Sequence, residues 1–156
     1  MNKILKLSLA IAAILLLASF VNNNKSSDSE VTCYLLCKAD LFGEPYTKLE
    51  KDLKKELSST EFVFTKDSIS ADYVIRIEAT TREYNHDTIA ETKIYCAYVD
   101  ATLSIDETAT RKRIYDNEIT VKGTHTLNFK EAARNGYQQM SKEIGDVLKN
   151  KILKDE

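Results

Sequence analysis

The stretch that decides the fold reads ADYVIRIEATTREYNHDTIAETKIYCAYVDATLSIDETATRKRIYDNEITV and covers residues 71–121. Three segments of it, residues 72–84, 92–106 and 111–121, are predicted to be β-strands, because apolar and polar residues alternate along them. A period of two is typical of an antiparallel sheet with one packed face and one wet face. Between the strands, residues 84–88 and 106–110 are rich in side chains that hydrogen-bond their own backbone, which predicts two turns.

The alternation divides the strand residues between two faces. The apolar face is predicted to carry Tyr73, Ile75, Ile77 and Ala79, followed by Tyr95, Ala97, Val99, Ala101, Leu103 and Ile105. The opposite face is predicted to carry mixed charges, hydroxyls and a tyrosine, namely Arg76, Glu78, Thr80, Arg82, Tyr98, Asp100, Thr102 and Ser104. This composition is typical of a solvated sheet surface, and it also suits a protein partner bound with moderate affinity. These eight residues are therefore the candidate partner-binding face, and the exposed edge of either outer strand is a second candidate.

The segments around this sheet predict two further strands and two helices. Residues 31–39 are predicted to form the first strand and residues 61–65 a short one. A helix is expected from Pro45, which suits the first helical position, to about residue 59, with an apolar stripe of Tyr46, Leu49, Leu53 and Leu57. A second helix is expected over residues 128–153. Asn128 would cap it, Glu131 would complete a capping pair, and the small residues Ala132, Ala133 and Gly136 would let it approach the sheet closely.

Both expected helices need an apolar surface, and the sheet offers one such face. The predicted fold is therefore α+β, a two-layer sandwich with a mainly antiparallel sheet of 4–5 strands and two helices packed on one face. Residues 31–154 suffice for a single domain with one core.

The first thirty residues predict export. Lys3 and Lys6 precede residues 7–21, an apolar run in which only Ser8 and Ser19 are polar. This is the pattern of a signal peptide, and it is shorter than the ~20 apolar residues of a spanning helix. No clean cleavage motif follows, so residues 1–21 are either a cleaved signal peptide or an uncleaved anchor. Residues 22–30 are polar and predict a disordered linker. Because the first cysteine is Cys33, a lipidated N-terminus is not expected.

Charge argues against a nucleic-acid partner. Without the two leader lysines, 20 basic residues face 24 acidic ones. Phosphate binding needs clustered positive charge, whereas the basic runs at residues 48–55 and 111–113 are short or interleaved with acids.

The three cysteines leave the disulfide question open. Cys33 and Cys37 lie in one predicted strand, so their Cα atoms would be about 13 Å apart, beyond the ~7 Å limit for a bridge. Either could pair with Cys96, or all three could be buried thiols. Cys96 falls opposite the apolar positions of its strand, which disfavours a bridge. Without a nearby histidine, the three thiols also make a poor zinc set.

Catalytic signatures are sparse. The four glycines form no phosphate loop, and no nucleophile motif occurs. The chain has two histidines: His86 precedes Asp87 in a predicted turn, and His125 precedes the last helix. His86 could act as a general base with Asp87 as its orienting acid. His86, Asp87 and His125 could together bind a metal only if the fold brought the two regions to one end. The expectation is that no cofactor is bound, and that the membrane is contacted only through an uncleaved N-terminus.

Several short segments carry a family resemblance: residues 71–75 (ADYVI) opening a strand, the hairpin through residues 97–106 with its acidic turn, residues 121–123 (VKG), and Ala132-Ala133 in an amphipathic final helix. In this order the chain resembles the small envelope domains around the N-terminal region of the curli-secretion lipoprotein, the penicillin-binding-protein activator lipoproteins and the TolB N-terminal domain. The resemblance implies an envelope binding or assembly module and transfers no functional residue. This chain lacks the lipobox cysteine of many members and the segments with which the curli protein makes a pore.

Two functional hypotheses follow. The first is an exported, non-catalytic protein of the periplasm or cell envelope that binds or assembles with another envelope protein or polymer. The alternative is a small exported hydrolase or metal-dependent enzyme that uses His86, Asp87 and His125.

Overall fold

The computed structural model describes residues 30–89 and 91–154, with the backbone alone at positions 85 and 87. Two helices and six strands occur in the described part, in the order β1 (Val31–Leu41), β2 (Glu44–Pro45), α2 (Lys48–Leu57), β3 (Phe62–Thr65), β4 (Tyr73–Ile89), β5 (Thr92–Glu107), β6 (Lys112–His125) and α3 (Phe129–Ile152). The predicted leader and linker lie outside the described residues, apart from Glu30.

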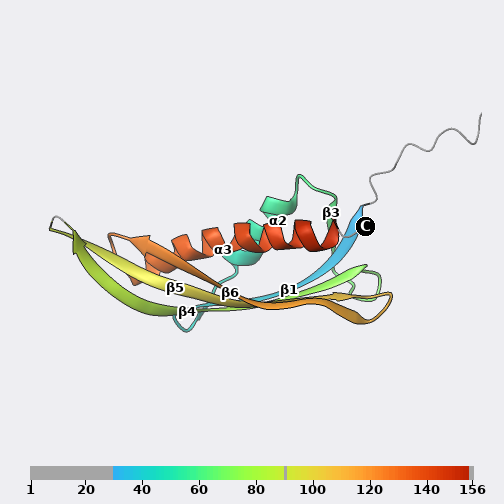
Figure 1. Ribbon diagram of the computed structural model, residues 1–156, viewed down its shortest axis with the longest axis horizontal. Helices are drawn as coiled ribbons and strands as arrows, with labels where there is room; N and C mark the ends of the chain where they lie inside the picture. The colour runs from blue at the N-terminus through green and yellow to red at the C-terminus, as the bar shows by residue number, and fades with distance from the viewer. Residues whose placement is uncertain (1–29, 90, 155–156) are drawn as a thin grey trace, which may run out of the picture. The chain divides into compact units, whose positions relative to one another are not determined.

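The six strands form one sheet in which β2, β1, β4, β5 and β6 are neighbours in that order, and β3 also pairs with β1 (Figure 1). The pairs β4–β5 and β5–β6 are antiparallel. Strand β1 runs parallel to both β3 and β4. The sheet is therefore mixed, with a long antiparallel meander joined to a parallel edge.

Both helices lie on one side of this sheet (Figure 1). The core between the layers is made of the residues that the alternation assigned to the apolar face: Ile75, Ile77, Leu103 and Ile105 are fully buried. The helices contribute Leu49, Leu53, Leu57, Tyr137, Met140, Ile144 and Leu148 to the same core. The predicted two-layer α+β sandwich is confirmed, with more strands than expected.

Helix α3 rests on β6 almost without side chains between them. A Cβ atom added to Gly123 would lie 2.0 Å from the carbonyl oxygen of Ala132 and 2.4 Å from the backbone nitrogen of Gly136. A Cβ on Gly136 would meet Val99 at 2.8 Å. The expected close approach of the last helix is therefore present, and Gly123 on the strand is the glycine that permits it.

The long hairpin corrects one prediction. Residues 84–88 were expected to form a turn, but β4 continues through them to Ile89 and pairs with β5 down to Thr92. Polar, turn-favouring residues are tolerated here because the pairing partner is a long strand and the side chains at this end are largely exposed. Strand β6 likewise continues to His125, beyond the predicted end at residue 121.

The start of the first helix is a second correction. Pro45 belongs to the two-residue strand β2, which pairs with the end of β1. The helix begins at Lys48, after Thr47. Tyr46 therefore precedes the helix, and its ring stacks on that of Tyr137 at a centroid distance of 4.5 Å. The predicted cap of the last helix is confirmed, since the Asn128 side chain accepts a hydrogen bond from the Glu131 N–H at 2.8 Å.

All three cysteines are free thiols in this structure, with Cys33 and Cys96 buried and Cys37 half-buried. Burial raises the pKa of the Cys33 and Cys37 thiols to about 12, and the nearby carboxylates Asp72 and Glu50, respectively, add to the rise. Both thiols are consequently protonated and unreactive near neutral pH. Neither α2 nor α3 is long and apolar enough to cross a membrane.

Candidate functional site

The eight residues of the candidate partner-binding face lie side by side across β4 and β5. The register opposes Arg76 to Ser104, Glu78 to Thr102, Thr80 to Asp100 and Arg82 to Tyr98. Because neighbouring residues of a strand point to opposite faces, these pairs lie on the side away from the helices. Every β4 member is exposed, and the β5 members are exposed or half-exposed.

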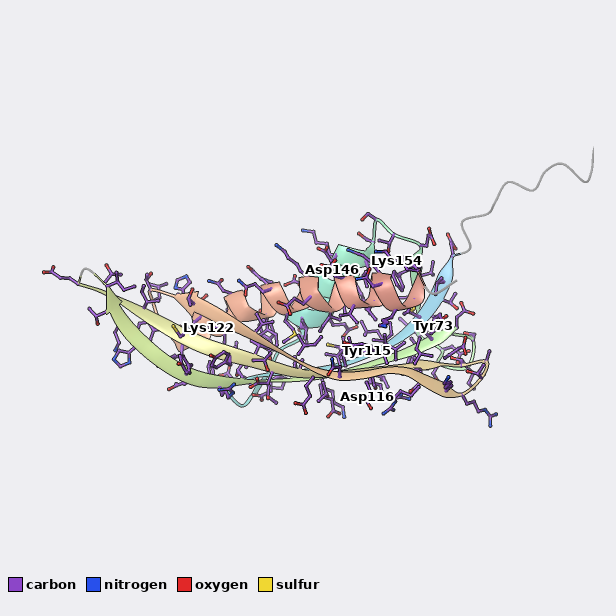
Figure 2. All side chains as sticks on the ribbon, viewed as in Figure 1. Tyr73, Tyr115, Asp116, Lys122, Asp146 and Lys154 are labelled. Carbon is purple, nitrogen blue, oxygen red and sulfur yellow. The ribbon has the colours of Figure 1, made fainter. Side chains whose placement is uncertain are left out.

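Strand β6 adds a third column to this face. Asp116, Glu118, Thr120 and Lys122 oppose Ser104, Thr102, Asp100 and Tyr98, respectively. Figure 2 shows Asp116 on the lower side of the sheet, whereas its neighbour Tyr115 lies on the side of the helices. We call these twelve side chains of β4, β5 and β6 the open face. The alternation in residues 116–122 was available in the sequence, but only two of the three strands were used to define the predicted face.

One end of the open face is a cluster of cations and aromatic rings. The Arg82 guanidinium lies 4.2 Å from the centroid of the Tyr98 ring. Tyr84, which continues this side of β4, meets Tyr98 edge-on at 4.9 Å, and the Lys122 ammonium lies 5.2 Å from the Tyr84 centroid. Tyr84 is 55% exposed. Cation–π contacts of this kind are worth about 0.5–1 kcal/mol at exposed sites, so they order the side chains without burying them.

The Asp100 carboxylate holds the Arg82 side chain of this cluster in place. Asp100 accepts hydrogen bonds from Arg82 Nε at 2.7 Å and from the Thr120 hydroxyl at 2.7 Å. The Arg82 hydrogen bond is the main reason that the pKa of Asp100 lies below its usual range; the Thr120 bond acts in the same direction, and partial burial opposes both. Asp100 is thus ionised at neutral pH, and it links one residue from each of the three strands.

A second ion-pair cluster occupies the other end of the open face. Asp106 pairs with Arg76 and accepts from Arg113 Nε at 2.8 Å, while Arg113 Nη1 reaches Asp116 at 2.9 Å. Hydrogen bonds from both arginines, that of Arg113 first, lower the pKa of Asp106 against a smaller effect of burial. Charged side chains at this end are therefore arranged in a network rather than left as independent solvated groups.

A shallow hollow of about 330 Å³ separates the two clusters. It is lined by three carboxylates and three hydroxyls in alternating positions: Glu78, Thr80, Asp100, Thr102, Glu118 and Thr120. A larger hollow of about 630 Å³ lies between α2 and α3 and is lined mainly by long charged side chains, among them Lys48, Lys55 and Lys142. The sheet hollow is the better docking candidate, because its lining side chains are short and several are already hydrogen-bonded.

The two histidines lie in one row of the sheet. His86 opposes Tyr95 on β5, and Tyr95 opposes His125 on β6. Two strand spacings place the histidine Cα atoms roughly 10 Å apart. The His86 ring lies 6.3 Å from the Tyr95 ring, and His125 Nδ1 accepts from the Leu127 N–H at 3.0 Å. The side chain of Asp87 lies outside the described part. The structure therefore brings the histidines to one end of the sheet, with Tyr95 between them.

No cluster of three or more histidine, cysteine, aspartate or glutamate side chains suited to a metal ion occurs in residues 30–89 and 91–154, as far as their side chains are described. Among these same residues, burial is the main cause of the raised pKa values of Cys33, Cys37, Tyr46 and Tyr137. Hydrogen bonds to Asp100 and Asp106, respectively, raise the pKa values of Arg82 and Arg113. The described geometry thus offers surfaces and hollows for recognition.

No protein-family model and no curated protein matches the sequence. Solved structures do share the fold. A minor lipoprotein from Acinetobacter baumannii aligns with a TM-score of 0.55 at 16% identity, over 75% of this chain and 89% of the other. A lipoprotein-like protein from Caulobacter crescentus aligns with 0.54 at 11%, over 84% and 96%. A homolog of a neuraminyllactose-binding hemagglutinin from Helicobacter pylori aligns with 0.55 at 14%, over 81% and 89%. At these identities the likeness establishes a fold shared with bacterial lipoproteins.

Proposed function

We propose that this chain is an exported, non-catalytic module of the bacterial cell envelope whose open face binds another envelope protein. Three observations support the proposal: the predicted leader, the fold shared with bacterial lipoproteins, and the order of elements that resembles the curli-secretion, penicillin-binding-protein activator and TolB domains. The proposed location is the periplasm or the surface of a membrane that faces it.

The observation that carries the proposal is the prior ordering of the open face. Arginine and tyrosine dominate binding hot spots, and here Arg82 and Tyr98 are stacked at 4.2 Å. Asp100 holds the same arginine at 2.7 Å. A side chain that is ordered before binding loses less conformational freedom on binding, which leaves more of the contact energy as affinity. The open face therefore has the composition and the rigidity of a docking surface.

An envelope polymer is the second ligand class that the open face could take. The exposed Tyr84 ring beside Arg82, Lys122 and the hydroxyl-lined hollow would suit a sugar chain that stacks on an aromatic ring and hydrogen-bonds at its rim. The Helicobacter protein that shares the fold is described as a homolog of a neuraminyllactose-binding hemagglutinin. This likeness is one of fold, so the protein partner stays the primary proposal and the polymer is an outcome of the same experiment.

Site-specific photo-crosslinking in intact cells tests the proposal. A photoreactive residue is placed at Thr102 or Glu118 on the open face, and at Gln139 on the exposed side of α3 as the matched control. We expect the two open-face positions to give one reproducible crosslinked protein that the control does not give. Replacing Arg82 with Ala in the crosslinking chain should lower the yield about tenfold or more, since hot-spot truncations cost on the order of 2 kcal/mol.

Other outcomes separate the alternatives. A crosslinked product that resists protease and stains for carbohydrate would assign the open face to a polymer. Equal labelling from Gln139 and from the open face, or no product while circular dichroism reports a folded chain, would contradict the proposed docking surface.

A further inference from the structure

The two edges of the sheet are protected to different degrees. On the β1 side, the outer edge is covered by β2 at one end and by β3 at the other. On the far side, β6 pairs with β5, and no other strand of the described residues pairs with it. Because alternate residues of an antiparallel strand direct their backbone groups to the same side, about half of the fourteen residues of β6 present N–H and C=O groups along this open edge. Two backbone groups of β6 are already bonded by side chains: the Glu118 N–H donates to Asn117 Oδ1 at 3.0 Å, and the Thr124 carbonyl accepts from Asn135 Nδ2 at 2.9 Å.

Proline and bulges, two of the devices that blunt an edge strand, are missing from most of β6, although the strand does carry charged side chains such as Glu118 and Lys122. It contains no proline. Its one register irregularity lies near Arg113, and pairing with β5 is regular from Tyr115 to His125. An edge of this length and regularity is a template for another strand. We infer that β6 pairs antiparallel with β6 of a second copy of this chain, about a two-fold axis.

Geometry limits the registers that such a pair can adopt. In an antiparallel pair the opposed residue numbers have a constant sum. That sum must be even if the open faces of the two copies are to stay on one side, because side chains alternate with a period of two. The two-fold axis must therefore lie between one residue of β6 and the same residue of the second copy, and we name each register by that residue.

Charge complementarity selects among these registers. An axis through Asn117 would set Asp116 against Glu118 of the second copy, and an axis through Glu118 would set that carboxylate against itself. Like charges directly opposed are destabilising. An axis through Ile119 would set Asp116 opposite Lys122 of the second copy, but Asp116 already forms an ion pair with Arg113. An axis through Thr120 sets Glu118 opposite Lys122 of the second copy, twice.

The register through Thr120 uses charges that the chain itself leaves unmatched. Neither Glu118 nor Lys122 has an ion pair with any residue of the described part, although eight other acidic or basic groups on or beside the open face do. The Lys122 ammonium instead lies over the Tyr84 ring. On the helix side, the half-buried Ile119 would meet Val121 of the second copy. Cross-strand apolar and opposite-charge pairs each contribute roughly 0.2–1 kcal/mol. The pairing would join two open faces into one continuous surface.

Charge reversal tests the inference, because a single reversal should weaken the dimer and the double reversal should restore it. Association of the exported protein, purified from expressing cells, is measured by sedimentation equilibrium across the micromolar range. We expect a reversible dimer whose dissociation constant rises about tenfold or more in Glu118→Lys and in Lys122→Glu, because each change opposes two pairs of like charges. The double variant should regain the affinity of the natural chain. An equimolar mixture of the two single variants should form mixed dimers.

The control is Lys38→Glu, which reverses an exposed lysine on β1, away from the β6 edge, and also breaks its 3.7 Å ion pair with Glu78. It should leave the dissociation constant unchanged. A natural chain that stays monomeric throughout the range would overturn the inference. So would a dimer that both single reversals leave intact, or a double variant as weak as the single ones. Because the readout is molecular mass, these outcomes are independent of whether the open face binds an envelope partner.

Discussion

The two faces of β4, β5 and β6 are built from alternate residues of the same strands, yet they are held together in different ways. On the helix side, Ile77, Leu103 and Ile105 are fully buried under α2 and α3. On the open face, Arg82, Asp100 and Thr120 are joined by hydrogen bonds and stay in contact with water. The covered face therefore carries the stability of the domain, whereas the open face is stiffened locally and is available for recognition.

Cys96 is an exception to this division. It belongs to the open side of β5 by its position in the alternation, yet only 2% of its surface is exposed. The open side is thus not uniformly exposed to water, since Cys96 is buried although most side chains toward the β4–β5 hairpin are exposed.

The largest expected effect tests the contact between β6 and α3. Gly123→Ala would force a Cβ within 2.0 Å of the Ala132 carbonyl oxygen, so the helix must move off the sheet. We expect a loss of about 3 kcal/mol or more in the free energy of unfolding, measured by urea denaturation. The matched glycine is Gly145 of α3, where an added Cβ would lie 3.1 Å from the flexible Glu56 side chain and at an ordinary 3.9 Å from Leu53 and Leu57.

Gly145→Ala should leave stability unchanged or raise it by up to about 1 kcal/mol, because alanine favours a helix. Equal losses at Gly123 and Gly145 would mean that α3 does not rest on β6 as described.

Two adjacent residues of β5 sharpen the comparison between the faces. Leu103 is fully buried, and Thr102 is exposed on the open face. Leu103→Ala should lower the free energy of unfolding by about 2–5 kcal/mol through lost burial and a cavity. Thr102→Ala should change it by no more than about 0.5 kcal/mol. Thermal melts of both variants measure the difference, and similar costs would contradict the assignment of the two faces.

The smallest effect concerns the pH dependence of the open face. The pKa of Asp100 is lowered in the folded chain, so its contribution is full above the ordinary carboxyl pKa of about 3.9 and is lost as the pH falls through the folded value. Asp100→Asn should therefore cost less than about 1 kcal/mol at pH 7, as expected for an exposed ion pair. This deficit should shrink below about pH 4 in acid-titrated urea melts. A deficit that persists unchanged at pH 2 would show that the carboxylate charge contributes nothing.

The sequence-based predictions succeeded where alternation or helical spacing was long. The buried positions of β4 and β5 and the Asn128 cap were readable because each depends on neighbouring residues alone. The parallel pairing of β1 with β4 was not readable, since it joins residues about forty positions apart and leaves no local mark. The hairpin extension was missed because residues 84–88 have turn-favouring side chains in a strand that tertiary pairing stabilises.

The candidate site was predictable only in part, for a related reason. The eight predicted residues do share a face, because a period of two fixes the face of each residue once its strand is known. The contacts that organise them depend on which strands are neighbours. Tyr84 was predicted to end its strand and begin a turn, and Lys122 lay beyond the predicted end of its strand. The aromatic and cationic cluster could therefore not be assembled from sequence.

The position at which the chain enters the sheet determines how far the β4–β5 hairpin lies from it. The N–H of Val31, the first residue of β1, already donates to the Glu61 carbonyl at 2.9 Å. From the level of Tyr73, beside Cys33, the seventeen residues of β4 extend away from that point, roughly 50 Å at ~3.3 Å per residue. The β4–β5 hairpin therefore lies at the end of the sheet far from Val31, where the chain enters it.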